Sequence, residues 1–540
     1  MEGDNLKSSE AVQVANEKNN CHWSNPTIES GSPPTRTIHG VSWLLVVVSL
    51  ISATFLWGLD GTIVADIQAT FVEEFHATDK LAWNSVAFFL GAAATVLSWG
   101  QIYSNFDAKW IFIFCVMFFE IGSAICGAAP SESFLITGRT ICGVGGAGMY
   151  TGVLTLLSLT TDEKERALYM GIPGITWGAG TVLGPVIGGA FALHASWRWG
   201  FYINLCVGAA CAPVYIFLVP SIDPQSGSSM KDRLKNVDWL GMILLAGAST
   251  TLIMGICFGG VVYPWKSART IVLFVLAFVF SLAFGIQQGL ALCTKHPVFP
   301  VSIVKNVSVL AIFFNETCSA TACFLPIYFI PLYFQYVRGD SPLKAGIYLL
   351  PFICAMVATV MVCGTVVSKT GHWMPWFFYG GALVLIGGVF MYTVDEGTSG
   401  AMVYGYSILI GSGSGAYIQM PFNAAQGFVE PSMIPAAVGL ITCAQLAGPA
   451  ITLSIANSVF LNKAVAQLKT ILPPGAPTLQ LVSGVGSEYL SSLDPGKQTE
   501  VLHAILQSMS NAYILIITSG TLTLVISSFL VLHSRWSARD

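Results

Sequence analysis

The sequence contains little charge, because Asp, Glu, Lys and Arg make up only 10% of its 540 residues. Ordinary soluble domains contain roughly 25%. Hydrophobic residues make up 54% of the chain, more than a soluble domain of this size can bury. A helix needs about 20 apolar residues to cross a bilayer, and runs of that length follow one another along the chain. The sequence therefore predicts a polytopic protein of the lipid bilayer.

Several functional signatures are missing from the sequence. Thirteen cysteines are present, but there is no CxxC pair and no His/Cys cluster with metal-ligand spacing, so we expect neither disulfides nor a metal site. The absence of a GxxxxGK segment disfavours ATP-driven transport, and no nucleophile or paired carboxylates indicate an enzyme. No basic stripe suggests nucleic-acid binding. We expect no cofactor and no obligate protein partner, and a channel or receptor remains the alternative to a transporter.

Apolar runs bounded by charges or turn residues predict an all-α membrane protein of about fourteen spans. The first seven lie near 43–65, 82–103, 110–129, 134–158, 169–193, 200–219 and 239–260. The other seven lie near 270–292, 309–334, 345–368, 375–394, 401–425, 437–461 and 511–533. An even number of spans places both termini on one side, and the excess of Lys and Arg in the loops of that side indicates the cytoplasm.

Two short turns, each with a lysine, hint at an internal repeat, because they follow the second and the tenth span. Such a repeat predicts two six-helix halves joined by two inserted helices. The expected division is a disordered cytoplasmic tail at 1–40, a first half at 41–219, a cytoplasmic loop at 220–238, inserted helices at 239–292, a second half at 293–533 and a cytoplasmic tail at 534–540. The second half includes an outer loop at 464–510.

Within that outer loop, Pro495 is expected to open a helix. Its apolar residues Val501, Leu502, Ile505 and Met509 share one face, which we expect to lie against lipid at the outer interface.

Only four residues of ionised type lie inside the predicted spans: Asp60, Glu120, Arg139 and Glu316. A charge inside a membrane costs several kcal/mol unless it is paired or hydrated, so these are the default functional candidates. Asp60 and Arg139 each lie about five residues from the outer end of a span, at similar depth, because a helix rises about 1.5 Å per residue. They are therefore expected to pair, either for proton coupling or as a fixed ion pair that holds helices together.

The remaining polar candidates are assigned to a central substrate cavity. Glu316 follows Asn315 in the ninth span, where it either meets a cationic substrate, carries a proton or stays a neutral acid bonded to a hydroxyl. Glu120 lies mid-span among apolar and aromatic residues. An apolar pocket with a few polar groups binds hydrophobic molecules, although interhelical hydrogen bonds would also explain such side chains. The amide candidates are Gln335, Gln419, Asn423 and Gln445.

Several segments resemble motifs of the fourteen-span drug:proton antiporters of the major facilitator superfamily, particularly fungal toxin and secondary-metabolite efflux pumps. LDGTIV at 59–64 is similar to the first-helix motif, which implies proton coupling by Asp60. LITGRTICGVGGAG at 135–148 resembles the fourth-helix motif, which implies proton transfer by Arg139. WRWGFYIN at 197–204 is also similar to the fourteen-span group. GPVIGG matches the antiporter motif, which implies roles for Gly184, Pro185, Gly188 and Gly189.

One departure concerns the cytoplasmic gating motif. This family usually has Asp and Arg where the chain has Ser104 and Asn105, which leaves Gly100 and Lys109 of the motif. The resemblance implies proton-coupled export of a small hydrophobic substrate by alternating access in the cell membrane, with a vacuolar membrane as the other location. A proton-coupled uptake symporter for a siderophore or another nutrient is the alternative with the same architecture.

Overall fold

The computed structural model describes residues 38–75, 81–260, 262–299, 301–340, 342–482 and 487–537. The tail expected to be disordered lies almost wholly outside these ranges, as does the end of the C-terminal tail. The described residues form helices joined by turns and contain no β-strand. The prediction of an all-α fold is confirmed.

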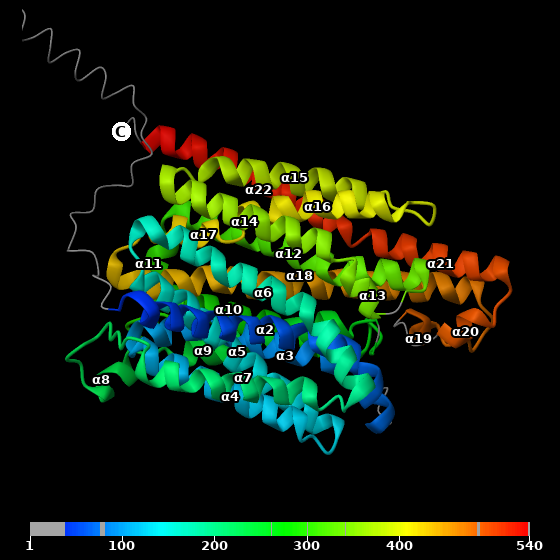
Figure 1. Cartoon of the computed structure of the whole chain (residues 1–540), viewed down its shortest axis with the longest axis horizontal. Helices are drawn as coiled ribbons and strands as arrows, with labels where there is room; N and C mark the ends of the chain where they lie inside the picture. The colour runs from blue at the N-terminus through cyan, green and yellow to red at the C-terminus, as the bar shows by residue number, and fades with distance from the viewer. Residues whose placement is uncertain are drawn as a thin grey trace, which may run out of the picture.

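The long apolar runs form the helices of the bundle (Figure 1). The first six are α2 (Gly40–Phe75), α3 (Leu81–Asn105), α4 (Ala108–Gly127), α5 (Glu132–Thr160), α6 (Glu163–His194) and α7 (Trp199–Phe217). The short α8 (Met230–Lys235) precedes α9 (Trp239–Phe258) and α10 (Ala268–Leu290).

The chain continues through another set of helices, and the last of them ends at the same end of the bundle at which α2 begins (Figure 1). They are α11 (Val301–Val304), α12 (Val307–Arg338), α13 (Pro342–Ile347), α14 (Leu350–Thr370), α15 (Met374–Tyr392), α16 (Gly400–Tyr417) and α17 (Met420–Gln426). After the short 3₁₀ helix η2 (Pro431–Met433) come α18 (Ile434–Ile471), α19 (Thr478–Val482), α20 (Ser487–Ser491), α21 (Pro495–Ser510) and α22 (Tyr513–Ser537).

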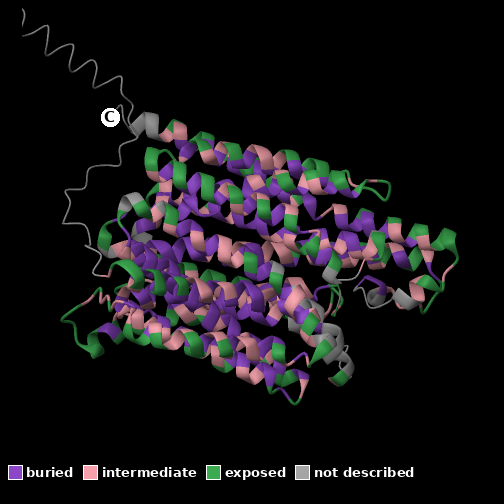
Figure 2. Ribbon diagram, viewed as in Figure 1, coloured by how far each residue is buried: buried purple, intermediate pink, exposed green. Residues whose placement is uncertain are grey.

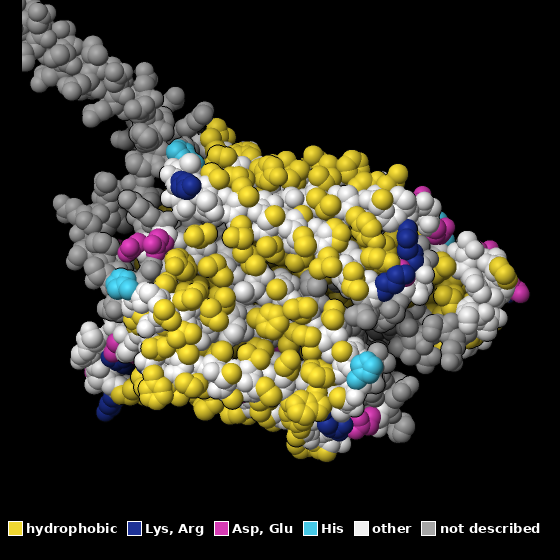
Figure 3. All heavy atoms as spheres, viewed as in Figure 1, with side chains coloured by type: hydrophobic (Ala, Val, Ile, Leu, Met, Phe, Trp, Pro, Cys, Tyr) yellow, Lys and Arg dark blue, Asp and Glu magenta, His cyan; other side chains and the backbone are white. Residues whose placement is uncertain are grey.

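Thirteen helices of the described chain are long and apolar enough to cross a membrane. Buried residues lie in the middle of the bundle (Figure 2). Hydrophobic side chains cover the long flank that Figure 3 shows, and charged ones gather at its two ends. This surface suits an environment that is lipid along the flank and water at the ends. The protein is therefore a multi-pass membrane protein, as predicted.

The expected span at 401–425 differs from the structure, because it is broken in two. The 18-residue α16 ends at Tyr417 and packs on α14 and α15, and α17 begins at Met420. Pro421 has no backbone N–H, so it cannot make the hydrogen bond to the carbonyl of Tyr417 that would continue α16. The break leaves Gln419 between the two helices.

The contacts of the first six helices recur among later ones. Helix α2 packs on α6 and α7, as α12 packs on α18 and α22. Helix α4 contacts α5 and α7, as α15 contacts α16 and α22. Two seams join these groups: the contact of α3 with α18, which we call the α3–α18 seam, and that of α6 with α14, the α6–α14 seam.

Helices α9 and α10 pack on each other at the edge of the bundle. Helix α9 also contacts both α3 and α18, and its Ile253 is buried with Leu90 and Ala450 from those helices. Helix α10 leaves Val275 and Phe278 exposed, a face that suits lipid. The α9–α10 pair therefore covers the α3–α18 seam.

The helix expected after Pro495 is present as α21, but its apolar face is not directed to lipid. Val501, Ile505 and Met509 are buried, and α21 packs chiefly on α18. Because α18 is 38 residues long, it extends past the other helices and provides a surface that α21 covers (Figure 1). The expectation of a lipid-facing helix is wrong for this reason.

Candidate functional site

Asp60 on α2 and Arg139 on α5 form a buried ion pair. Arg139 Nη1 donates to Asp60 Oδ2 at 2.5 Å and to the backbone oxygen of Asp60 at 3.0 Å. The two side chains are 0% and 2% exposed. The guanidinium carbon lies 4.3 Å from the ring centre of Phe88, so an aromatic face covers the cation. The predicted pairing of these residues is confirmed.

A second set of hydrogen bonds holds the other oxygen of Asp60. Asn204 Nδ2 on α7 donates to Asp60 Oδ1 at 3.1 Å and to Ser123 Oγ on α4 at 3.0 Å. Four helices, α2, α4, α5 and α7, thus meet at one carboxylate. Sequence reasoning did not identify these two partners, although Asn204 ends the WRWGFYIN segment and is a polar residue in an apolar run.

The four residues of the antiporter motif all lie in α6: Gly184, Pro185, Gly188 and Gly189. A β-carbon at Gly184 would lie 2.1 Å from Thr62 Oγ1, and one at Gly188 would lie 2.8 Å from Ile63 Cγ1. Thr62 Oγ1 donates to the carbonyl of Thr181 on α6 at 3.1 Å. These glycines let α6 approach the turn of α2 that follows Asp60, which fixes the position of that helix.

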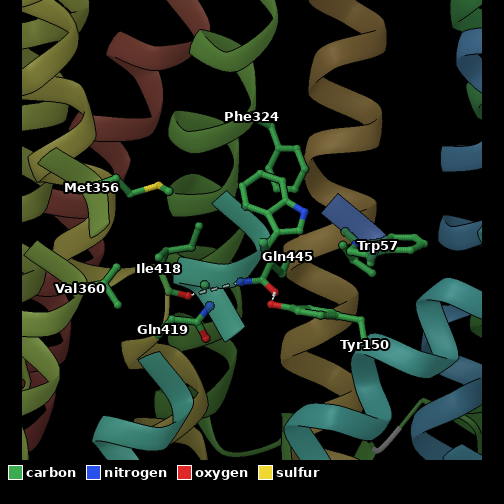
Figure 4. Close-up of a pocket in the computed structure, with 11 residues that line it drawn as sticks. Trp57, Tyr150, Phe324, Met356, Val360, Ile418, Gln419 and Gln445 are labelled. Carbon is green, nitrogen blue, oxygen red and sulfur yellow. Dashed lines mark hydrogen bonds between the residues drawn. The ribbon is translucent and has the colours of Figure 1, made fainter. Parts of the chain in front are cut away.

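A small cavity lies between the two groups of helices (Figure 4). Tyr150 Oη donates to Gln445 Oε1 at 2.7 Å, and Gln445 Nε2 donates to the carbonyl of Ile418 at 3.4 Å. The volume of about 20 Å³ is room for roughly one water. The cavity is lined by Trp57, Tyr150, Gly174, Trp177, Phe324, Met356, Val360, Ile418, Gln419, Gln445 and Leu446.

The candidates assigned to a substrate cavity are found in different places. Gln419 and Gln445 line this cavity. Glu316 on α12 lies next to the side-chain amide of Gln445, whereas the amide of Asn315 has no hydrogen-bond partner among the described residues. Three candidates lie away from the cavity lining. Glu120 is on α4, Gln335 is near the C-terminal end of α12, and Asn423 is on α17. The aromatic residues of the lining were not predicted, because they do not differ in sequence from other apolar core residues.

The segment that resembles the gating motif contains a close backbone contact. A β-carbon on Gly100 of α3 would lie 2.7 Å from the α-carbon of Gly439 on α18. Gln426 Nε2 on α17 donates to Ser158 Oγ, near the C-terminal end of α5, at 3.1 Å. The backbone N–H of Lys109 is capped by a carboxylate oxygen of Asp107 at 2.9 Å.

Neutral hydrogen bonds occupy the place of the usual charges. Ser104 Oγ donates to the carbonyl of Gly100 at 2.9 Å, and Asn105 Nδ2 donates to that of Gln101 at 2.9 Å. Asn105 Oδ1 also accepts from Gln225 Nε2 at 2.9 Å, which connects α3 to the loop between α7 and α8.

A buried carboxylate at the start of α9 connects the C-terminal end of α3 to α9 and α10. Asp238 accepts hydrogen bonds from Gln287 Nε2 at 2.9 Å, Gln288 Nε2 at 2.7 Å and the backbone N–H of Val298 at 3.1 Å. Its own N–H donates to Gln101 Oε1 at 3.1 Å. We call this set the Asp238 network. Sequence reasoning placed Asp238 only in a loop.

Comparison with known proteins agrees with this architecture. The model of the Major Facilitator Superfamily matches residues 45–453. The chain is 46% identical over 510 residues to the MFS-type transporter pgmG of Aspergillus terreus, covering 94% of this chain and 91% of that one. It is 43% identical over 498 residues to the efflux pump alnA of Emericella nidulans, covering 91% and 90%. It is 39% identical over 505 residues to the efflux pump patC of Aspergillus clavatus, covering 92% of each.

Solved structures share the fold at low sequence identity. The human organic anion transporter MFSD10 superposes with a TM-score of 0.54 at 14% identity, covering 89% of this chain and 100% of that one. A bacterial homolog of the human lysosomal transporter Spinster gives a TM-score of 0.53 at 15% identity, covering 91% and 98%. The chain therefore belongs to the Major Facilitator Superfamily.

Proposed function

We propose that this protein exports a small hydrophobic compound, such as a secondary metabolite, toxin or drug, in exchange for protons. The observation that carries the proposal is the Asp60–Arg139 pair, an ionisable carboxylate buried among four helices with a permanent cation beside it. The relatives support the direction of transport, because two of them bear the name efflux pump at about 40% identity.

The ion pair supplies a way to couple proton binding to helix movement. In this conformation Asp60 is paired with Arg139 and accepts a hydrogen bond from Asn204, so its ionised form is stabilised. A proton on Asp60 removes the charge that attracts Arg139, and the packing of α2 against α5 and α7 then loses its strongest polar contact. Proton binding therefore favours a different arrangement of these helices.

The cavity behind Tyr150 is the proposed cargo site. Its aromatic walls suit an apolar ligand, and Gln419 and Gln445 supply hydrogen bonds. Glu316 beside Gln445 would select cargo with a hydrogen-bond donor or a positive charge. Cavities that bind drug-sized ligands measure roughly 300–1,000 Å³. The present cavity is far smaller, so cargo binding requires the two groups of helices to separate.

The two groups are proposed to be the moving halves, 41–219 and 293–533, with the helices at 239–292 inserted between them. The recurring contacts of α2 to α7 among later helices support this division. We place both termini in the cytoplasm and the inner gate at Gly100, near the cytoplasmic end of α3. The cell membrane is the proposed location.

The first experiment identifies the cargo. Deletion of the gene in the source organism, followed by untargeted mass spectrometry of cells and medium, should show a compound that is retained in the deletion strain. A compound left in the medium of the deletion strain would instead indicate an uptake symporter.

The second experiment tests proton coupling with that compound. In inside-out vesicles with an imposed pH gradient, Asp60→Asn and Arg139→Ala should abolish gradient-driven uptake of the cargo. Asp223→Asn is the matched control, because Asp223 pairs with Arg233 in the cytoplasmic loop and should leave transport unchanged. Normal transport by the Asp60 variant would refute its assigned role.

A further inference from the structure

Glu120 on α4 is a carboxylate without a partner inside the membrane. Both of its oxygens are buried, and neither makes a hydrogen bond within the described chain. The side chain lies against the backbone of α7, where a β-carbon on Gly208 would be 2.3 Å from Oε1. Glu120 does not line the cavity, so cargo contact gives no reason for its presence.

The position of Glu120 relates it to the ion pair. Glu120 lies one helical turn before Ser123 on α4, and Gly208 lies one turn after Asn204 on α7. Asn204 donates hydrogen bonds both to Ser123 and to Oδ1 of Asp60. Glu120 is therefore about 5.4 Å along the helices from this network, toward the cytoplasmic end. The charge of Asp60 acts on it electrostatically.

If Asp60 and Glu120 were both ionised, their two negative charges would not be balanced by the single positive charge of Arg139. Arg139 is the cation of the site, and Asp60 is its partner here. A second carboxylate ion with no hydrogen-bond donor would be unfavourable by several kcal/mol in the membrane interior. In the arrangement seen, the neutral acid is therefore Glu120.

We propose that Asp60 and Glu120 share one proton and alternate as the anionic partner of Arg139. When the carboxylic acid of Asp60 releases its proton, the resulting carboxylate pairs with Arg139 and the carboxylate of Glu120 receives that proton. The reverse transfer leaves Glu120 as the anion of the layer. Only an O–H bond breaks and another forms. The role in transport depends on the proposed function, whereas the sharing of the proton does not.

Polar groups continue from Glu120 toward the cytoplasm. Ser52 Oγ on α2 lies 3.2 Å from Cys211 Sγ and 3.3 Å from Tyr215 Oη, both on α7, and Tyr215 Oη donates to the carbonyl of Ser49 at 2.9 Å. None of these residues lines the cavity. The proton thus leaves between α2, α4 and α7, apart from the cargo.

The other ionisable groups of this region come from the helices packed around α4. Helix α5 contributes Arg139 and the thiol of Cys142, which lies 3.6 Å from Ser123 Oγ. Helix α7 contributes the Tyr215 hydroxyl.

Infrared difference spectroscopy of the purified protein in lipid nanodiscs tests the proposal without any cargo. A buried, protonated carboxylic acid has a carbonyl stretch that shifts on exchange into heavy water. At neutral pH the wild-type protein should show such bands, and Glu120→Gln should lack one component. Asp60→Asn should lose the same component, because Arg139 then requires the anion of Glu120. Glu316→Gln is the matched control, because Glu316 is a second buried carboxylate on a different helix, α12, and this change should remove a different component.

The proposal is overturned if Glu120→Gln has the wild-type spectrum, or if Asp60→Asn keeps the component that Glu120→Gln removes. If Glu120→Gln does not fold, the other two variants still test the sharing of the proton. Asp60→Asn should then lose a component that Glu316→Gln retains. Failure of the pH gradient to drive transport in vesicles would refute the proposed function alone, because these spectra do not depend on transport.

Discussion

The close contact of α3 with α18 predicts that one added methyl group separates these two helices at the proposed inner gate. A β-carbon on Gly100 would lie 2.7 Å from Gly439 Cα, well inside the 3.4 Å at which ordinary contact begins. The atom it meets belongs to the backbone, so no side chain can rotate away. Gly100→Ala therefore requires the two helices to move apart at their cytoplasmic ends.

The magnitude follows from the energetics of overpacking. Extra methylenes in a packed core cost about 1–3 kcal/mol. A single methyl group should destabilise the closed seam by about 1–2 kcal/mol, which raises the population of the open form about 5- to 30-fold. Gly439→Ala disturbs the same contact, so the two changes together should have less than the sum of their separate effects.

Accessibility of Ser158 measures that population. Ser158 is fully buried and bonds to Gln426 across the two groups of helices. We would place a cysteine there in a background without other cysteines and label it with a membrane-impermeant maleimide from the cytoplasmic side. Gly100→Ala should raise the labelling rate about 5- to 30-fold.

Gly405→Ala is the matched control, because Gly405 is also within a helix and a β-carbon there meets nothing within 4 Å. Its labelling rate should equal that of the parent. Equal rates for Gly100→Ala and Gly405→Ala would show that the glycine contact does not hold the inner end closed.

Three further changes test other parts of the structure. Asn204→Leu removes a donor from the buried aspartate and should lower the free energy of unfolding by about 1–3 kcal/mol, measured by denaturant titration in detergent. Asp238→Ala leaves several buried donors without their acceptor; it should lower stability by about 2–3 kcal/mol and accelerate labelling of the cysteine reporter at the inner gate. Hydrogen bonds from Arg198 and Trp197 lower the pKa of Glu74, whose ordinary value is 4.5. Because the pKa of Glu74 is depressed in the folded state, its contacts should stabilise the start of α7 above pH 4.5. This stabilisation should be lost as the pH falls through the lowered pKa. Hydrogen exchange should show the loss in the parent protein but not in Glu74→Gln.

The sequence is sufficient to predict much of this arrangement. Uninterrupted apolar runs fix the long helices, because each must satisfy its backbone hydrogen bonds internally in lipid. Equal distance from the span ends predicts that Asp60 and Arg139 meet, and the structure confirms it. GPVIGG, which matches the antiporter motif, lies where Gly184 of α6 closely approaches α2.

Features that depend on contacts between distant segments were not predictable. The hydrogen bonds of Asn204 depend on how α7 is rotated against α2 and α4, which apolar content does not specify. The break between α16 and α17 was missed because apolar residues continue through Tyr417 and Pro421. The partners of Asp238 lie up to 137 residues away, so its sequence neighbours give no indication of them.

The placement of α9 covers one of the two seams on its lipid side but not the other. Helix α9 lies against the α3–α18 seam, whereas neither inserted helix packs on the α6–α14 seam in the described chain. Trp177 of α6 and Met356 of α14 are both walls of the cavity. A compound that has already partitioned into the bilayer therefore meets α9 in front of the α3–α18 seam, but neither α9 nor α10 in front of the α6–α14 seam.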